Sequence, residues 1–248
     1  MNVSSYYAAA KINALRDRLQ STACILRRKH QVKNHSYISY SYLDPSTGKR
    51  HEHIDSSPNG KHLEQLYRER LTIKAELERW QIIWDSTFAT PIPYLDLSSL
   101  RITKKSIITK DFFDSLISSS NPKPIARPNP YKGIVFRSKS EREIAEILDE
   151  LAIEYKYEPR IPVNDYEIYA DFVCFIRELG IGFIIEHCGL MDSPAYVDKT
   201  IRTFRDYIGL GFLPSIHVLF TYEKSNLPPT REYFRSQINR ILDSLCSP

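Results

Sequence analysis

Cysteine is scarce in this chain of 248 residues, and no long apolar run is present. The four cysteines are scattered and form no CxxC pair, which argues against a cysteine-paired zinc site and a dense disulfide framework. No apolar stretch approaches the roughly 18 residues that a membrane span requires. The first residues also lack the charged start and apolar block of a signal peptide. We therefore expect a soluble, cytoplasmic protein without a membrane partner.

Positive charge is concentrated in the first third of the chain. Residues 1–80 carry 14 Lys and Arg against 8 Asp and Glu, whereas residues 81–248 carry 20 against 22. Between residues 11 and 33, seven basic side chains face only Asp17. Such a segment can neutralise the phosphates of nucleic acid, although a solvated helix face also explains many charge runs. The candidate phosphate contacts here are Arg27, Arg28 and Lys29.

The N-terminal region, residues 1–90, is predicted to be a helix–hairpin–helix extension. Apolar residues at three- and four-residue steps predict a helix over residues 4–29. Alternation predicts a β-hairpin made of residues 37–43 and 49–54, and a second amphipathic helix covers residues 60–88. This region would grip nucleic acid, or it would join two chains into a homodimer, because its second helix has an apolar stripe that needs burial. The stripe consists of Leu66, Ile73, Leu77 and Trp80.

Residues 131–248 are predicted to form the main domain, separated by a linker. Residues 91–130 contain six prolines and a serine-rich patch, which mark the linker. Periodicity then predicts the order α-β-β-β-α-β-α. The helices cover residues 138–152, 194–208 and 230–245, and the strands cover residues 154–158, 166–175, 181–188 and 216–222. This alternation is typical of an α/β domain.

Two acidic residues lie inside apolar strand patterns. Asp171 stands in YADFVCF and Glu186 in GFIIEHCG. An unpaired carboxylate in such a place is costly, and a divalent cation removes that cost. Carboxylates, a backbone carbonyl and water are the usual ligands of Mg²⁺. The alternative is that both acids pair with Arg or Lys, or face water at strand ends.

The segments FRSKSE, ADF, IIEHCG and LMDSPAYVDK resemble the PD-(D/E)XK superfamily of restriction-endonuclease-like nucleases. More narrowly, they are similar to a bacterial group with the pattern RSKSE…PDF…EHxGxxDxPxY. The resemblance covers residues 137–223. It implies an αβββαβ core, which matches the order predicted above. It also implies a metal-dependent endonuclease that hydrolyses DNA, or RNA, with Mg²⁺ or Mn²⁺ as cofactor.

Carried over residue by residue, the resemblance assigns the metal-binding acids to Asp171 and Glu186. Glu141 matches the acid on the leading helix. Its position also fits a capping box with Ser138, in which Glu141 closes the helix N-terminus, and the two roles are compatible. Arg137 and Lys139 flank this position and are candidate contacts to nucleic acid.

The sequence departs from the superfamily pattern at two places. Ala170 replaces the proline of the motif, and Cys188 stands where a lysine is usual. A neutral thiol does not supply the positive charge of a lysine. His187 is a candidate for orienting water or accepting a proton, although it can equally be a hydrogen-bonded strand residue. Lys199 or Lys139 could restore the positive charge from a neighbouring helix.

Two functions of different classes therefore follow from the sequence. The first is a nuclease that uses Glu141, Asp171, Glu186, His187 and Lys199. The second is a catalytically inactive nuclease-like fold that binds nucleic acid or protein. A nuclease site that had lost its activity would also lack the lysine.

Overall fold

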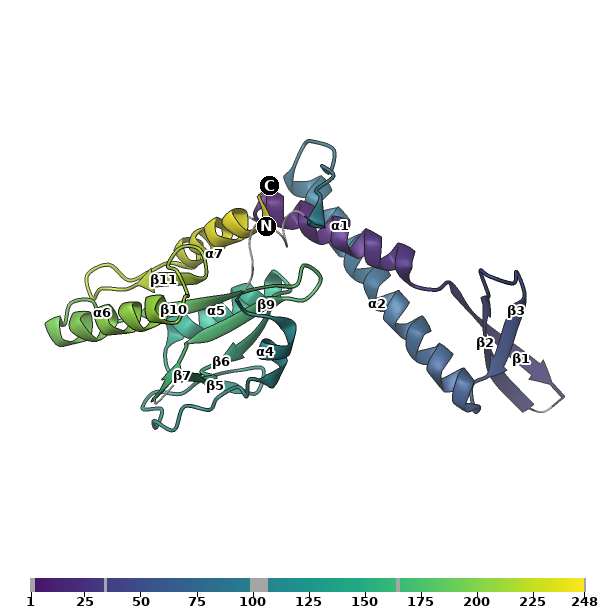
Figure 1. The fold of residues 1–248 in the computed structure, drawn as a ribbon, viewed down its shortest axis with the longest axis horizontal. Coiled ribbons are helices and arrows are strands. Elements are labelled where there is room, and N and C mark those ends of the chain that lie inside the picture. The colour runs from purple at the N-terminus through teal and green to yellow at the C-terminus, as the bar shows by residue number, and fades with distance from the viewer. Residues whose placement is uncertain (1–2, 34, 99–106, 164–165, 248) are drawn as a thin grey trace. The chain divides into compact units, whose positions relative to one another are not determined.

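The computed structural model describes residues 3–33, 35–98, 107–163 and 166–247. The chain divides into two compact units, Lys11–Pro93 and Met1–Ala10 together with Tyr94–Pro248 (Figure 1). Helix α1 (Ser5–Ser21) begins in the second of these units and continues into the first. Among the helices of the described ranges, none combines the length and the apolar character needed to cross a membrane.

The unit Lys11–Pro93 contains a three-stranded antiparallel sheet that packs on one long helix. Its strands are β1 (Ile25–Val32), β2 (His35–Leu43) and β3 (Arg50–Ile54), in the order β1-β2-β3, and its helix is α2 (Pro58–Thr87). Ile25, Tyr40 and Leu63 are buried together between the sheet and α2. The hairpin and the second helix lie where the sequence predicts them.

The first predicted helix is wrong in its extent, because α1 ends at Ser21 and not near Lys29. The hydroxyl groups of Ser21 and Thr22 donate to the carbonyl of Arg18, at 3.0 and 2.6 Å, and so compete with the helical hydrogen bonds. The basic residues that follow lie on β1, which pairs with β2 over its whole length. Tertiary strand pairing thus overrides the helical periodicity of this segment.

Two of the four residues in the predicted apolar stripe of α2 are buried. Ile73 and Trp80 are almost completely buried. The Arg70 side chain of α2 donates to the carbonyl oxygen of Leu19 at the end of α1, at 2.7 Å, so α1 and α2 lie against each other. Ile73 and Trp80 therefore need no second chain for their burial, Leu66 and Leu77 are half-buried, and the homodimer stays a prediction.

The second unit is built on a four-stranded mixed sheet in the order β11-β10-β9-β6. Strands β10 and β11 are parallel and the other pairs are antiparallel, which confirms the α/β class. The strands are β6 (Glu154–Tyr157), β9 (Phe172–Ile176), β10 (Ile181–Cys188) and β11 (Val218–Tyr222). The helices are α4 (Lys110–Ser115), α5 (Lys139–Glu150), α6 (Pro194–Gly209) and α7 (Arg231–Cys246). Two small hairpins are formed by β4 (Asn129–Tyr131) with β5 (Ile134–Phe136), and by β7 (Arg160–Val163) with β8 (Tyr166–Tyr169).

The strand predicted over residues 166–175 is two strands. Its first half, β8, pairs with β7, and its second half, β9, lies in the central sheet between β6 and β10. The break falls at Ala170 and Asp171. Asp171 therefore precedes β9, at the point where the chain enters the main sheet.

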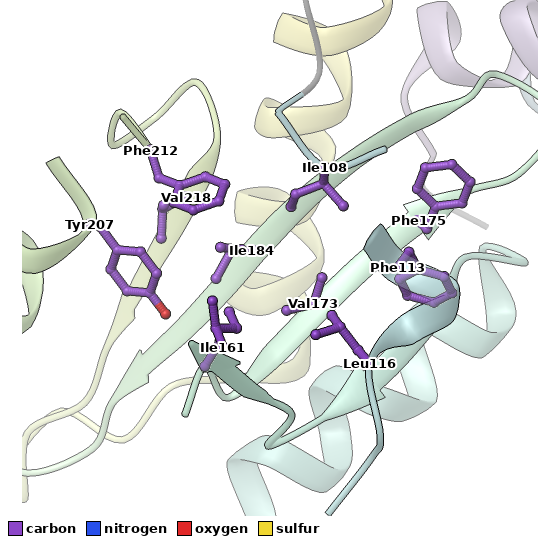
Figure 2. Close-up of a cluster of buried hydrophobic side chains, with 11 residues drawn as sticks. Ile108, Phe113, Leu116, Ile161, Val173, Phe175, Ile184, Tyr207, Phe212 and Val218 are labelled. Atoms are coloured by element: carbon purple, nitrogen blue, oxygen red, sulfur yellow. The ribbon is translucent and has the colours of Figure 1, made fainter. Parts of the chain in front are cut away.

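An apolar cluster fills the face of the sheet that carries Val173 and Ile184 (Figure 2). Tyr207 of α6 and Phe113 of α4 contribute to it, so these two helices cover this face. The opposite face carries α7, whose Phe234 ring contacts His187. The sheet is thus covered on both faces, as its nearly continuous apolar strands require.

Helix α6 turns a different face to the sheet from the one predicted. Its apolar stripe is partly exposed, with Ile201 and Ile208 at 46 and 45 %. The inner face carries polar side chains that line a cavity, among them Thr200, Thr203 and Tyr207. A helix beside a polar cavity satisfies its polar side chains there, and this outweighs the burial of the apolar stripe.

The middle of the predicted linker, residues 91–130, belongs to the core. Ile108, Phe113 and Leu116 are buried in the apolar cluster (Figure 2). The ring of Phe113 stacks on that of Phe175, with 5.3 Å between centroids. Helix α4 is capped by Thr109, whose hydroxyl accepts from the amide of Phe112 at 3.2 Å. Proline content alone therefore overestimates the linker.

Phe113→Ala is expected to lower the free energy of unfolding by about 3–5 kcal/mol, because it opens a cavity in a packed aromatic cluster. Ile117 is 75 % exposed and two residues beyond α4, so Ile117→Ala is a matched control. The control should change stability by no more than about 0.5 kcal/mol. Urea unfolding measures both. Equal effects of the two variants would contradict the placement of Phe113 in the core.

Candidate active site

Asp171 and Glu186 are brought opposite each other on neighbouring strands. The register of β9 and β10 ends with Phe172 paired to Ile185, so Asp171 and Glu186 occupy the next opposing positions. Side chains directly opposite on an antiparallel pair point to the same face. Both carboxylates line one cavity of about 380 Å³.

Each of the two carboxylates is held by a hydrogen bond from the protein. The amide of His187 donates to Oδ2 of Asp171 at 2.7 Å. The hydroxyl of Tyr207 donates to Oε1 of Glu186 in a very short contact. Tyr207 is a residue of this site that sequence reasoning missed. These bonds fix the orientation of both acids toward the cavity.

Burial raises the pKa of both acids. The pKa of Asp171 lies well above its usual range because the group is desolvated, and because the charges of Glu186 and Glu141 repel its ionised form. Burial likewise raises the pKa of Glu186 to about 7, although the Tyr207 hydrogen bond and the positive charge of Lys199 act in the opposite direction. A site of this kind favours a bound cation or proton.

Glu141 caps helix α5 as predicted, and it also lines the cavity that holds Asp171 and Glu186. It closes a complete capping box with Ser138 at the start of α5. Its Oε2 also accepts from the amide of Arg137 at 2.9 Å and from the hydroxyl of Tyr157 at 2.7 Å. At the same time Glu141 lines the carboxylate cavity, and burial raises its pKa.

Glu158 is a further acid of this cavity that sequence reasoning missed, and Glu167 and Asp206 also line it. Its amide donates to the carbonyl of Asp171 at 3.0 Å, so it lies on the other side of Asp171 from Glu186. Its carboxylate accepts from Nε of Arg137 and from the side-chain nitrogen Nδ2 of Asn121, both at 2.6 Å. The signal available in the sequence was an acid at the end of the strand predicted over residues 154–158. Its ion pair with Arg137 makes it a structural part of the cavity wall.

The imidazole of His187 points away from the carboxylates of Asp171 and Glu186. Neighbouring strand residues point to opposite faces, so its ring leaves the face that carries Glu186. Nδ1 lies 3.0 Å from the hydroxyl of Thr221, and Nε2 lies 3.1 Å from Oε2 of Glu223. Burial lowers the pKa of the ring, and Glu223 opposes this shift. The structure brings the amide of His187, rather than its imidazole, to Asp171.

The candidate basic residues differ in their availability. Lys199 of α6 lines the cavity, with Nζ 5.5 Å from the centre of the Tyr196 ring. Arg137 is committed to Glu158 and to the carbonyls of Pro124 and Lys123, at 2.9 and 2.7 Å. Lys139 is exposed on the first turn of α5. Lys199 is thus the best placed of the three to supply charge to the cavity.

Burial raises the pKa of the Cys188 thiol to about 12, so it stays neutral. Among the described residues, no group of three or more His, Cys, Asp and Glu side chains is arranged as a complete metal site. Two carboxylates nevertheless fit Mg²⁺, which keeps several waters and often takes only one or two carboxylates from a protein. Asp171 and Glu186 offer that donor set at a cavity.

If the cavity is the metal-dependent nuclease site that the resemblance implies, Glu141→Gln is expected to reduce cleavage about 10- to 100-fold, as loss of a group that supports a metal site does. Glutamine retains an acceptor for the capping box, so the melting temperature should be nearly unchanged. Ser138→Ala is the matched control. It should cost about 1 kcal/mol of stability and leave the cleavage rate intact. Full activity of the Gln variant would leave Glu141 with the capping role alone.

No family model, curated protein or solved structure matches this chain. Its function is therefore inferred from the geometry of its own residues.

Proposed function

We propose that this chain is a metal-dependent nuclease of the PD-(D/E)XK type that hydrolyses phosphodiester bonds in DNA or RNA. The observation that carries the proposal is the pairing of Asp171 and Glu186. They lie side by side on one face, where β9 begins and beside β10, the two central strands of the sheet, and both half-buried side chains line one cavity. The order of helices and strands around them, from α5 to β11, contains the α-β-β-β-α-β succession of that superfamily, with the β7–β8 hairpin inserted.

Asp171 and Glu186 would hold Mg²⁺ or Mn²⁺. Such an ion, when bound, lowers the pKa of water and stabilises charge that develops on a phosphate. The chain itself orients the two carboxylates through the His187 amide and the Tyr207 hydroxyl. Lys199 places a positive charge at the same cavity, where it attracts an anionic phosphate and replaces the charge missing at Cys188.

A second candidate function is binding without cleavage. The observation that favours it is Cys188, whose neutral buried thiol stands where the superfamily has a lysine. The cavity would then retain its shape and its acids without performing hydrolysis. Nucleic acid or a protein would be the ligand.

Incubation of the purified chain with supercoiled plasmid and with labelled oligonucleotides separates the two functions. The nuclease proposal expects cleavage that needs Mg²⁺ or Mn²⁺ and stops with EDTA. Glu186→Gln should remove it. Glu232→Gln is a matched control, because Glu232 is an exposed acid on the first turn of α7. Binding of nucleic acid with no cleavage under either metal would favour the second function.

Charge reversal at Arg27, Arg28 and Lys29 is expected to weaken binding of nucleic acid and to flatten its salt dependence. These side chains are exposed on β1. Each lost phosphate contact should reduce the slope of log K against log salt by about 0.7–0.9. Fluorescence anisotropy at several salt concentrations measures this slope. An unchanged slope would exclude β1 from the interface.

A further inference from the structure

A second cavity, of about 450 Å³, lies beside the end of β11. Its walls are largely apolar and include Tyr222, Leu227, Pro228, Tyr233 and Met191. Tyr222 and Leu227 are 46 and 73 % exposed, so the rings and side chains of this wall are accessible from solvent. We call this cavity the stacking pocket.

The stacking pocket is close to the acidic cavity along the sheet. Glu186 of β10 pairs in parallel with Phe220 of β11, and Tyr222 follows two residues later. Tyr222 therefore points to the same face as Glu186. Strand spacing and rise per residue place the two Cα atoms roughly 8 Å apart. The Thr200 hydroxyl, which lines the acidic cavity, contacts the sulfur of Met191 at 3.9 Å, and Met191 lines the stacking pocket.

Several polar groups around the stacking pocket already form hydrogen bonds within the chain. Glu223 accepts from the hydroxyl of Ser140 at 2.8 Å and contacts His187. The hydroxyl of Tyr233 accepts from the amide of Tyr222 at 3.2 Å. Lys224 adds a positive charge to the lining. A flat apolar ligand attached to an anionic backbone can stack on the aromatic rings while its backbone is attracted to the charge of Lys224.

We propose that the stacking pocket receives a nucleobase of the substrate strand, next to the phosphodiester group bound at Asp171 and Glu186. The proposal rests on the proposed nuclease function. Stacking of bases on aromatic side chains tolerates any base, because every base has a π-face. A base in this pocket must leave its duplex stack, which costs least in a single strand. The preferred substrate class is therefore single-stranded nucleic acid or a frayed end.

The test is a double-mutant cycle between the ring and the base, measured by fluorescence anisotropy in Mg²⁺ with strands whose phosphodiester linkages are replaced by non-hydrolysable ones. Wild-type chain, Tyr222→Ala and Tyr222→Phe are each titrated with a short single-stranded oligonucleotide. Abasic positions are then scanned through the same strand. Tyr222→Ala is expected to weaken binding about 10-fold, which lies in the range for a lost stacking contact. Tyr222→Phe, which keeps the ring, should bind within about 2-fold of the wild type.

One abasic position should weaken binding of the wild type to a similar degree and abolish the effect of Tyr222→Ala. Leu227→Ser supplies a second variant that alters the pocket wall at an exposed side chain, so the conclusion does not depend on the fold of one variant. It should weaken binding of the intact strand more than binding of that abasic strand. Additive losses at every abasic position would overturn the proposal. If the pocket instead binds a protein partner, Tyr222→Ala should not change the affinity for either strand, and this result would also overturn the proposal.

Failure of the stacking pocket and failure of the nuclease function give different results. If the chain cleaves nucleic acid with metal but the mutant cycle is additive, the nuclease proposal stands and the stacking-pocket proposal is wrong. If the cycle is non-additive but no cleavage occurs, the stacking-pocket proposal stands and the second function, binding without hydrolysis, is supported. A chain that binds no oligonucleotide overturns both.

Discussion

Asp171→Asn is expected to abolish metal-dependent cleavage while the melting temperature of the metal-free protein stays unchanged or rises. The Asp171 carboxylate is buried beside Glu186 and Glu141, whose charges raise its pKa. Asparagine retains an oxygen that accepts the His187 amide and removes the charge that is costly to bury. The substitution should also erase the stabilisation that Mn²⁺ gives the parent. Differential scanning fluorimetry with and without Mn²⁺, together with the cleavage assay, measures all three effects.

A structural ion pair at Asp171 would give the opposite result. Breaking a buried pair typically costs about 3–5 kcal/mol, which would lower the melting temperature with or without metal. The carboxylate of Asp171 accepts a hydrogen bond from the His187 amide, and burial together with the charges of Glu186 and Glu141 raises its pKa. Asp111→Asn is the matched control, at an exposed acid on the first turn of α4. A metal-independent loss of stability for Asp171→Asn alone would contradict the site.

The parts of the fold that local patterns encode could be predicted. The apolar faces of α5 and α7 and the continuous apolar run of β10 lie where periodicity places them. The opposition of Asp171 and Glu186 also follows, because a short hairpin between two strands fixes their register. These features depend on a few neighbouring residues, so they can be predicted from local sequence patterns.

Features that depend on distant partners were missed. Arg27 lies on a strand because β2 pairs with it, although its own segment has helical periodicity. Ile201 is exposed because α6 turns Thr200 and Tyr207 toward the acidic cavity. Glu158 joins that cavity only through pairing of β6 with β9. In each case a tertiary contact outweighs a local preference, and a single sequence does not display such contacts.

The acidity of Glu186 gives the protein a defined pH dependence. Burial raises the pKa of this group from 4.5 in the unfolded chain to about 7 in the folded one. Between these values the folded chain keeps a proton that the unfolded chain has lost. The stability associated with Glu186 is therefore fully present below pH 4.5 and is lost as the pH rises to about 7. At about 1.4 kcal/mol per pH unit, the loss amounts to about 3 kcal/mol.

Glu186→Gln has no such proton to lose, so the metal-free variant should become progressively more stable than the parent as the pH rises through this window. Comparison with Glu232→Gln removes the contribution of exposed acids. Metal binding needs the ionised carboxylate, so the thermal shift caused by Mn²⁺ in the parent should grow up to about pH 7 and then level off. Tyr207→Phe removes a hydrogen bond that lowers the pKa of Glu186, and it should move this midpoint to higher pH. A Mn²⁺ shift that is independent of pH across the window would show that Glu186 does not hold the ion.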